Sequence, residues 1–402
     1  MAFTGGWHWL RATAIAALAV LCTSLGLPTT TATAASPALG ADTAPQLHVS
    51  GNKLVGSNGN TVVLHGVDRS GTEYQCSDGY SIFDGPNDQA SISALKSWGA
   101  AVNAVRVPLN EGCWNGESYV KPQYAGANYR NAITNYVQLL NANGIVAILD
   151  LHWSDGAFSG GTYSCGANAM CQKPMPDSAQ AVPFWTSVAD TFKGNDSVVF
   201  DLFNEPFNSL LNVTGAASDG WNCWKNGGSC PGISYQVAGM QQLVNSVRST
   251  GANNVLMLGG LSWSNDLSQW MQNEPNDPDH NLAASWHSYS NEGCATASCW
   301  NGQAGPVMPS VPVVAGEIGQ FDCQGTYIDP LTKWLESQNA SFLAWSWDAS
   351  HKCYSPQLIS NYDGTPTSSY GATYKAILKA LPRATAGRRN LTRPLPHRQP
   401  RK

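Results

Sequence analysis

The sequence predicts an α/β fold, a closed (β/α)8 TIM barrel with an N-terminal β-hairpin and disulfide-stapled loops on one face. Eight short apolar runs of strand length recur over about 300 residues, and stretches with the periodicity of amphipathic helices lie between them. Strand–helix alternation is typical of a parallel sheet, and eight such units favour a closed barrel. The alternative is an open, doubly wound sheet, but the chain contains neither a GxGxxG motif nor a P-loop.

The segments before the predicted barrel indicate export. Residues 1–34 have the features of a secretory signal peptide: Arg11, an apolar run over residues 12–27, and the small-residue cleavage site Ala32-Thr33-Ala34. Residues 35–46 form a short linker that contains Pro and Ala. We expect the mature protein to be secreted, without a membrane anchor, and to be monomeric.

The predicted barrel domain covers residues 47–381 and begins with a hairpin over residues 47–55, which turns at Gly51-Asn52. Two amphipathic stretches, 129–140 and 237–247, are predicted to be helices. The eight candidate strands are short runs rich in Val, Leu, Ile or Phe. They cover residues 62–67, 104–108, 145–151, 198–203, 255–258, 282–286, 311–315 and 342–345.

Charge is distributed unevenly along the chain. Residues 35–382 contain 14 basic and 27 acidic residues, a net charge of −13, which argues against a nucleic-acid partner. The C-terminal tail, residues 382–402, contains seven Lys or Arg and no acid, and we expect it to be disordered. Fifteen Trp and fourteen Tyr provide flat, half-polar surfaces suited to stacking on sugars, although a large core also uses Trp.

The cysteine pattern predicts disulfides. Ten of the eleven cysteines lie beyond the predicted signal peptide, and an even number in an exported chain indicates up to five bridges. All ten lie after a predicted strand and before its helix, on the face where barrel enzymes carry out chemistry. Pairing within a loop or between neighbouring loops predicts Cys76–Cys113, Cys165–Cys171, Cys223–Cys230, Cys294–Cys299 and Cys323–Cys353. Because no CxxC pair, HExxH motif or His-rich tract is present, we expect no metal site and no cofactor.

Two of the predicted strands end in glutamate. The run Val198 to Pro206 places Glu205 at one strand end, and the run Val313 to Gly319 places Glu317 at another. Three strand steps around a barrel of roughly 7 Å radius put the two Cα atoms about 13 Å apart and the carboxyl groups roughly 5 Å apart. That separation is typical of a retaining glycosidase, in which one carboxylate attacks the sugar and the other protonates the leaving group.

Four further motifs complete a resemblance to a known family. They are Val105-Arg106-Val107-Pro108, Asp150-Leu151-His152-Trp153, His287-Ser288-Tyr289 and Ala344-Trp345-Ser346-Trp347. Together with the two glutamate segments, and in this order, they resemble glycoside hydrolase family 5, the cellulase family of clan A. The resemblance covers roughly residues 47–380. It implies a TIM barrel and the hydrolysis of a β-linked polysaccharide with retention of configuration.

The resemblance also implies a role for each matching residue. It implies that Glu205 is the general acid/base, that Glu317 is the nucleophile, and that Asn204 holds the sugar 2-hydroxyl. Arg106 matches the residue that orients the nucleophile, and Tyr289 matches the hydroxyl that hydrogen-bonds it.

Other matching residues are expected around the cleaved sugar. His152 and His287 match the two histidines that line its site, and Trp345 matches the aromatic platform beneath it. Glu73 is a further candidate for substrate contact, whereas Asp150 and Asp201 are interpreted as buried structural acids. Tryptophans of the active-face loops are candidates for outer sugar subsites: Trp114, Trp153, Trp221, Trp224 and Trp300.

We predict a secreted, retaining endo-β-1,4-glucanase that acts on cellulose-type polysaccharide. The same chemistry on mannan, xyloglucan or a β-1,6- or β-1,3-linked glycan is the alternative, because the loops decide the substrate and their Cys-rich insertions depart from the plainest cellulase pattern. A non-catalytic sugar-binding barrel is disfavoured, since both Glu205 and Glu317 are present. A serine esterase would need a GxSxG motif, which the sequence lacks.

Overall fold

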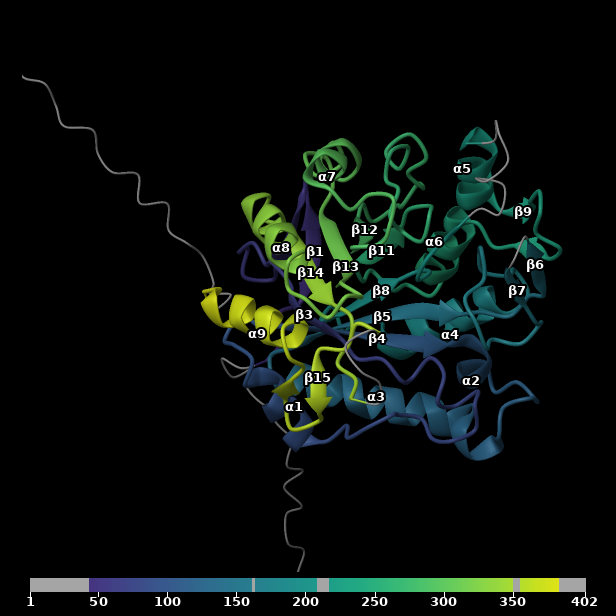
Figure 1. Cartoon of the computed structure of the whole chain (residues 1–402). Coiled ribbons are helices and arrows are strands. Elements are labelled where there is room, and N and C mark those ends of the chain that lie inside the picture. Colours follow the sequence, from purple (N-terminus) through teal and green to yellow (C-terminus); the bar gives the residue numbers. More distant parts are fainter. Residues whose placement is uncertain (1–42, 161–162, 208–216, 350–354, 383–402) are drawn as a thin grey trace, which may run out of the picture. The chain divides into compact units, whose positions relative to one another are not determined.

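The computed structural model describes residues 43–160, 163–207, 217–349 and 355–382 (Figure 1). Eight parallel strands form a closed barrel in chain order, with the last strand beside the first. The predicted (β/α)8 barrel is confirmed, and each predicted strand has its counterpart. The barrel strands are β3 (His65–Asp68), β4 (Ala104–Asn110), β5 (Val146–Trp153), β8 (Val198–Asp201), β11 (Leu256–Gly259), β12 (Leu282–Tyr289), β13 (Val313–Gly319) and β14 (Ser341–Ala344).

Strand residues alternate between two hydrophobic cores. A smaller cluster lies inside the barrel and contains residues from seven of the eight barrel strands. On β5, Val146 and Ile148 belong to this inner cluster. Ala147 and Leu149 belong to the larger cluster, which also contains the buried helix residues. The same alternation continues beyond Ile148, so that the next inward positions on β5 are polar. The barrel interior therefore changes from apolar to polar toward the carboxyl ends of the strands.

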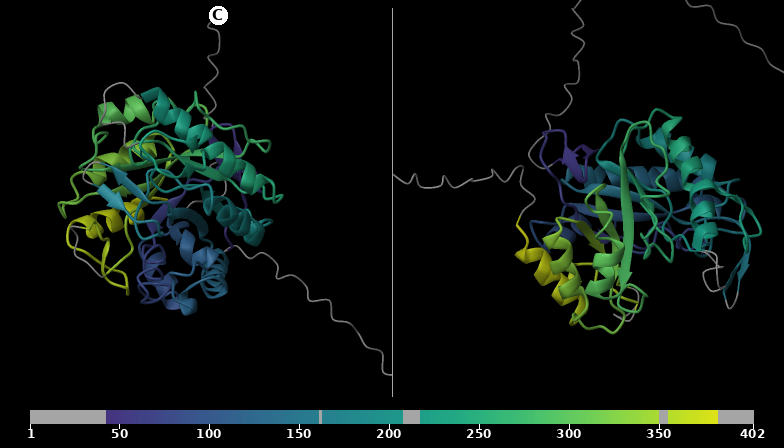
Figure 2. Two further views of the ribbon diagram at one scale, coloured as in Figure 1. Left: turned by 90° about the vertical axis from the view of Figure 1, so that its right-hand side faces the viewer. Right: turned by 90° about the horizontal axis from the view of Figure 1, so that it is seen from above.

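Helices follow seven of the eight barrel strands and lie around them (Figure 2). They are α1 (Gln89–Lys96), α3 (Ala127–Ala142), α4 (Ala181–Phe192), α6 (Met240–Arg248), α7 (Ala297–Gln303), α8 (Ile328–Ser337) and α9 (Tyr370–Ala380). Residues 260–281, between β11 and β12, contain turns but no helix, which departs from a strict (β/α)8 repeat. Within the described ranges, no helix combines the length and apolar character needed to cross a bilayer.

The loops after the strands contain additional short elements. These are α2 (Glu111–Asn115), η1 (Pro122–Tyr124), β6 (Phe158–Gly160), β7 (Tyr163–Cys165), α5 (Ala217–Asn226), β9 (Gly228–Ser229), β10 (Gln236–Val237), β15 (Ile359–Asn361) and β16 (Thr365–Pro366). The helix predicted from residue 237 begins at Met240 instead, because Val237 pairs with Gly228 in a two-stranded ladder.

The predicted N-terminal hairpin is confirmed as β1 (Leu47–Ser50) and β2 (Lys53–Gly56), which pair in antiparallel register. Leu47 and Leu54 are buried and belong to the cluster inside the barrel. The hairpin therefore covers the end of the barrel opposite the polar strand ends.

Four predicted disulfides are confirmed: Cys76–Cys113, Cys165–Cys171, Cys223–Cys230 and Cys294–Cys299, with Cα separations of 5.2 to 6.2 Å. The fifth prediction involves Cys353, which lies outside the described residues.

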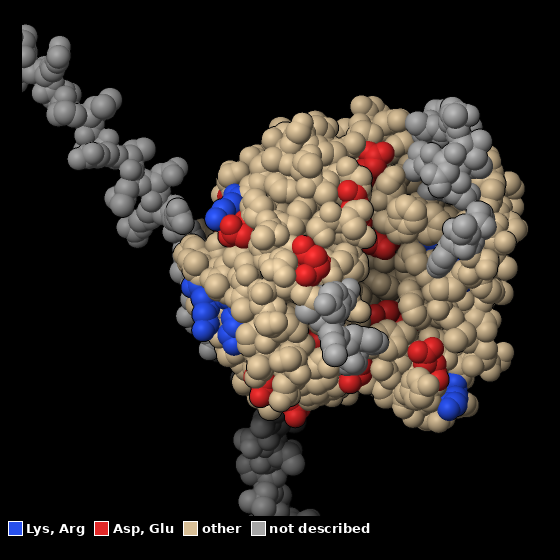
Figure 3. Space-filling view, viewed as in Figure 1, with Lys and Arg blue, Asp and Glu red and all other residues tan. Residues whose placement is uncertain are grey.

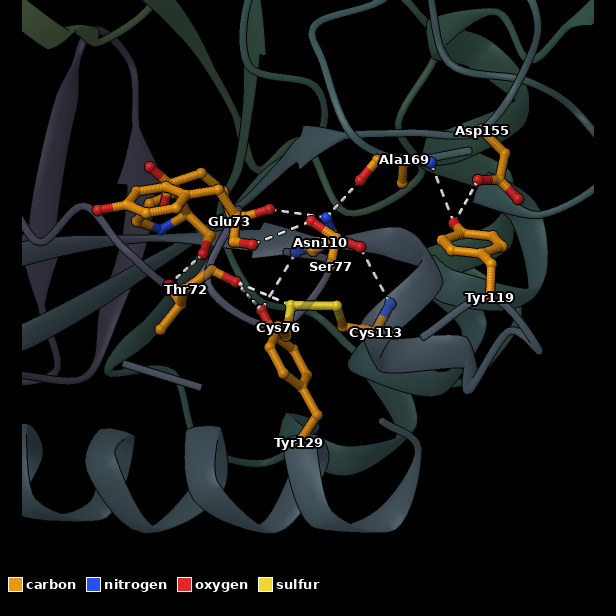
Figure 4. The surroundings of a disulfide bond; sticks show 12 residues. Thr72, Glu73, Cys76, Ser77, Asn110, Cys113, Tyr119, Tyr129, Asp155 and Ala169 are labelled. Carbon is orange, nitrogen blue, oxygen red and sulfur yellow. Dashed lines mark hydrogen bonds between the residues drawn. A yellow bond between two sulfur atoms is a disulfide. The ribbon is translucent and has the colours of Figure 1, made fainter. Parts of the chain in front are cut away.

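The bridge between Cys76 and Cys113 joins the loops after β3 and β4 (Figure 4). Beside it, the Asn110 side chain donates hydrogen bonds to the carbonyls of Glu73 and Ala169, each at 2.7 Å. Three active-face loops are therefore held to one another.

Candidate active site

The centre of the polar barrel mouth is Arg106, a fully buried residue on the inner face of β4. Its guanidinium lies 2.7 Å from Glu317 and 3.1 to 3.2 Å from Asp68, Asp150 and Asp201. Burial lowers the pKa of Arg106, but the surrounding carboxylates raise it well above its ordinary value. The acids of four other barrel strands are thereby held by one positive charge.

Glu317 reaches the barrel interior because β13 contains a bulge. Along β13 and β12, Ala315 pairs with Trp286 and Glu317 pairs with His287, so Gly316 is an extra residue. Strict alternation from the inward-facing Val314 would turn Glu317 outward. The extra residue reverses that parity and places the carboxylate against Arg106.

Both oxygens of Glu317 accept hydrogen bonds, and the side chain is almost fully buried. Arg106 donates to Oε1 at 2.7 Å, and the Tyr289 hydroxyl donates to Oε2 at 2.5 Å. Burial and the negative charges of Glu317 and Glu205 raise the pKa of Tyr289 well above its ordinary value. Tyr289 therefore keeps its proton and remains a donor.

Glu205 has a different environment, since its side chain is 19% exposed and its contact is a histidine. Its Oε1 lies 3.1 Å from Nδ1 of His287. Burial, and then the negative charge of Glu317, raise the pKa of Glu205 well above its ordinary value. Burial and the positive charges of Arg106 and His152 lower the pKa of His287, so this imidazole is neutral. Glu205 can thus hold a proton that it can donate.

The two glutamates lie close together. One carboxylate oxygen from each of Glu205 and Glu317, and a ring nitrogen of His287, are within 4.8 Å of one another. This upper limit is consistent with the roughly 5 Å estimated from the strand positions and with the short separation typical of retaining glycosidases. The face seen in Figure 3 is hollowed, and acidic side chains lie in and around the hollow.

His152 and Trp345 form a second group at the barrel mouth. Their rings stack with centroids 5.4 Å apart and an angle of 17° between the planes. Nδ1 of His152 lies 2.9 Å from Asp150, which also contacts Arg106. Burial lowers the pKa of His152, but the charge and hydrogen bond of Asp150 raise it above the ordinary value. The peptide bond between Trp345 and Ser346 is cis.

The Asn204 side chain makes hydrogen bonds with two residues, Arg106 and Gln172. Of these two, Gln172 was not predicted from the sequence. Oδ1 of Asn204 accepts from Arg106 at 2.8 Å, and its Nδ2 donates to Gln172 at 3.0 Å. Gln172 also donates to the Glu205 carbonyl at 3.1 Å. Gln172 follows Cys171, and its place in a stapled active-face loop was the only sequence signal for it.

The structure brings the predicted residues together as two connected groups. Direct hydrogen bonds or ion pairs join Arg106, Asn204, Glu205, His287, Tyr289 and Glu317. His152 and Trp345 are joined to Arg106 through Asp150. Asp150 and Asp201, interpreted as structural acids, are buried partners of Arg106.

The prediction of outer sugar subsites was wrong for four tryptophans. Trp114, Trp221, Trp224 and Trp300 are at most 4% exposed and pack in the core. Trp153 is half-buried, with its ring 6.4 Å from that of Tyr74.

Glu73, the other outer candidate, is a buried residue. It accepts hydrogen bonds from the Ser70 hydroxyl and the Gly71 amide. Burial raises its pKa to about 7. An aromatic that the sequence analysis did not single out, Trp263, is 49% exposed.

Comparison with known families gives one match over most of the chain. The model described as cellulase, glycosyl hydrolase family 5, matches residues 57–351.

Curated relatives are similar at low identity. A mannan endo-1,4-beta-mannosidase of Streptomyces lividans is 24% identical over 310 residues, which are 75% of this chain and 66% of that protein. A manganese dependent endoglucanase of Phanerodontia chrysosporium is 27% identical over 208 residues, which are 50% of this chain and 44% of that protein. The chain thus spans no more than two thirds of the length of these relatives.

Solved structures share the fold. A β-glucanase from Saccharophagus degradans aligns with a TM-score of 0.62 at 20% identity, covering 84% of this chain and 93% of that one. A β-mannanase from Streptomyces thermolilacinus aligns with a TM-score of 0.58 at 20% identity, covering 83% and 95%.

Proposed function

This chain belongs to the cellulase family, glycosyl hydrolase family 5, and from that membership we propose that it is a secreted, retaining endo-β-1,4-glucanase. The observation that carries the proposal is the pair of glutamates at the barrel mouth. Their oxygens lie within 4.8 Å of one another, and their surroundings differ. Glu317 accepts hydrogen bonds from Arg106 and Tyr289, whereas Glu205 is partly exposed and lies against a neutral histidine.

In the first step, Glu317 attacks the anomeric carbon of the bound sugar. The bond from that carbon to the leaving oxygen breaks, and Glu205 gives its proton to the leaving oxygen. The raised pKa of Glu205 favours the protonated form that this step needs. Arg106 and Tyr289 hold the Glu317 oxygens in place while the ester to the sugar forms.

In the second step, water attacks the same carbon, the ester bond to Glu317 breaks, and the water proton passes to Glu205. Esterification removes the negative charge of Glu317, which is one cause of the raised pKa of Glu205. The pKa of Glu205 should therefore fall when the intermediate forms, as a base requires. One residue can then serve as acid in the first step and as base in the second.

The remaining predicted residues contact the cleaved sugar in this proposal. Trp345 and His152 stack on one another and offer an aromatic platform at the barrel mouth. Asn204, fixed by Arg106 and Gln172, holds the sugar 2-hydroxyl. Four disulfides support an oxidising compartment, as expected for a secreted protein that acts as a monomer on a polysaccharide.

Mannan is the second candidate substrate for the same mechanism. The curated relatives include both a mannan endo-1,4-beta-mannosidase and an endoglucanase. The relatives therefore do not favour one of these two polysaccharides over the other as the substrate.

A panel of soluble polysaccharides tests both candidates. Carboxymethylcellulose, galactomannan, xyloglucan, a β-1,3-glucan and a β-1,6-glucan are incubated with the enzyme, and reducing ends and viscosity are followed together. We expect the largest release from carboxymethylcellulose, with viscosity falling well before reducing ends accumulate. Release from galactomannan alone would select the second candidate, and release in proportion to end-wise cleavage would exclude endo action. Glu317→Ala serves as the control for contaminating activity.

A further inference from the structure

We propose that Gln172 is a positioning residue of the catalytic centre, which fixes the side-chain amide of Asn204 and the backbone at Glu205 from a stapled loop. Gln172 acts on the reaction through these two residues. The inference rests on the proposed retaining function, in which Asn204 holds the sugar 2-hydroxyl and Glu205 is the acid/base.

The side-chain amide of Gln172 has only one orientation that satisfies its neighbours. Its Nε2 donates to two backbone carbonyls, that of Lys173 at 2.9 Å and that of Glu205 at 3.1 Å. A carbonyl oxygen can only accept, so the amide nitrogen of Gln172 must face these two groups. Its Oε1 therefore faces Asn204, from which it accepts at 3.0 Å.

The orientation of Gln172 determines the orientation of the Asn204 amide. Asn204 is buried, and its Oδ1 accepts at 2.8 Å from the guanidinium of Arg106, a group that can only donate. Its Nδ2 carries two hydrogens, of which Gln172 takes one and the other remains for the sugar 2-hydroxyl. Without Gln172, a single hydrogen bond from Arg106 would hold Asn204, and its NH₂ group would have no fixed direction.

The segment that carries Gln172 also contacts the backbone around Glu205. Besides the bond from Gln172 to the Glu205 carbonyl, the Phe207 amide donates to the Pro174 carbonyl at 2.9 Å. The Glu205 side chain is partly exposed and lies 3.1 Å from one histidine nitrogen. The direction of its carboxyl group therefore depends on the backbone that these contacts fix.

A buried lysine holds the loop in which Gln172 lies. Lys173 is fully buried, and its ammonium donates to the carbonyls of Gly166 at 2.8 Å and Asn168 at 2.9 Å. Burial lowers the pKa of Lys173 to about 8, although nearby acids oppose the shift, so the ammonium is charged in mildly acidic solution. The charge binds the end of the loop to its middle.

The same loop is clamped by side chains from β4 and the segment that follows it (Figure 4). The Asn110 side chain donates to the Ala169 carbonyl at 2.7 Å, and the Ala169 amide donates to the Tyr119 hydroxyl at 3.0 Å. The disulfide between Cys165 and Cys171 closes the loop just before Gln172. A loop held at this many points can present one side chain in a fixed position, as a catalytic centre requires.

The test uses Gln172→Met in the full chain, which keeps the length of the side chain and removes both hydrogen bonds. Aryl glycosides of the sugar that the polysaccharide panel selects are the substrates, and kcat/KM is compared with wild type. With a good leaving group the first step needs no proton, so the loss reports the Asn204 contact, and we expect about three- to tenfold. With a poor leaving group Glu205 must give its proton, and we expect a loss about threefold larger again.

A double-mutant cycle with Asn204→Ala separates positioning from a general loss of structure. In the Asn204→Ala background, Gln172→Met should cause no further loss with the good leaving group, because the amide that Gln172 positions is absent. The extra loss with the poor leaving group should persist, since it depends on Glu205. Gln242→Met, at an exposed position of α6, is the matched control and should equal wild type in each assay.

A purely structural role predicts the same loss with both leaving groups and in both backgrounds, and this result would overturn the proposal. If urea unfolding shows that Gln172→Met does not fold, Gln172→Glu replaces it. Its carboxylate still accepts from Asn204 but cannot donate to the Glu205 carbonyl, so only the substrate with the poor leaving group should react more slowly. Equal losses on the two substrates in this variant would also contradict the assigned role.

Failure of the proposed function is recognised separately. If wild type cleaves neither the aryl glycosides nor any polysaccharide, the retaining function fails, and the contact is tested without turnover. Proton exchange of the Asn204 side-chain amide, followed by NMR on protein labelled at asparagine nitrogen, should be faster in Gln172→Met than in wild type. The Asn204 signal is assigned by its absence from Asn204→Ala, and equal exchange in the two proteins overturns the positioning role.

Discussion

Arg106 is the residue on which the catalytic geometry depends. It is fully buried and contacts four acids and the amide of Asn204, so every one of these side chains has a fixed partner. Removing one member of a buried charge network leaves an uncompensated charge and costs about 3–5 kcal/mol. The two glutamates can have different roles because Glu317 contacts Arg106 directly, whereas Glu205 contacts His287.

The proposed roles of the two glutamates predict different chemical rescue. Glu317→Ala should lose activity on every substrate by several orders of magnitude, whereas Glu205→Ala should retain the first step on an aryl glycoside with a good leaving group. Azide should give the β-glycosyl azide with Glu205→Ala, because it attacks the intermediate from the face that water uses. It should give the α-azide with Glu317→Ala, by direct attack through the vacated space. Product configuration by NMR decides, and the opposite pattern would reverse the assignment.

The coupling between the glutamates can be measured directly. Burial and the negative charge of Glu317 raise the pKa of Glu205. Glu317→Gln removes that charge with little change of shape, so the pKa of Glu205 should fall relative to wild type. Carbon NMR titration of labelled glutamate Cδ atoms measures it, and Glu117→Gln, in the loop after β4, is the control. An unchanged titration of Glu205 in Glu317→Gln would show that the carboxyl groups are not coupled.

Among the elements, β13 and the stapled loops determine the active face. The bulge at Gly316 turns Glu317 inward, and little space remains around the α-carbon of Gly316. A Cβ at Gly316 would lie 3.0 Å from the Ser285 hydroxyl oxygen and 3.2 Å from Nε2 of His287. Glycine therefore allows the bulge to approach β12 closely enough for Glu317 and His287 to share the site.

The disulfides should contribute to stability according to the loops that they close. Cys76 and Cys113 are 37 residues apart, whereas Cys223 and Cys230 are 7 apart. Chain entropy predicts losses of about 4 and about 2 kcal/mol, respectively, when each pair is replaced by alanine. Urea unfolding of the two double variants without reductant measures the difference. A larger loss for the shorter loop would contradict the entropic account.

At the scale of the whole molecule, many carboxyl groups are buried with raised pKa values. Burial raises the pKa of Glu73 and of Asp201 to about 7, and that of Glu292 to about 8. An acid whose pKa is raised in the folded state stabilises the fold below its unfolded pKa, and this stability is lost as pH rises through the folded value. The free energy of unfolding should therefore be larger near about pH 5 than near about pH 8.

Glu73→Gln provides the matched test of this pH dependence. For Glu73, the shift to a pKa of about 7 corresponds to a loss of up to about 3 kcal/mol between about pH 5 and pH 8. Glutamine keeps the volume but cannot ionise, so the variant should lose less stability over this range than wild type. Urea unfolding at both pH values measures the difference. Equal differences in the two proteins would falsify the contribution of Glu73.

Much of the architecture follows from local sequence. Strand runs, their order and the Asn204-Glu205-Pro206 and Glu317 strand ends predict the barrel and its mouth, because apolar periodicity is a property of neighbouring residues. Four cysteine pairs were also predicted correctly, since cysteines in one loop or in adjacent loops have few partners within reach. The family motifs identified the side chains that the strands bring together.

Other features were decided only by tertiary structure. Alternation along β13 would face Glu317 outward, and only its pairing with β12 and β14 reveals the extra residue at Gly316. Burial decided which tryptophans meet solvent: Trp114 packs against Phe184 in the core, whereas Trp263 is 49% exposed and stacks on Phe207. The physical reason is common to these cases. Register and exposure depend on contacts between segments far apart in the chain, and no local pattern of residues specifies them.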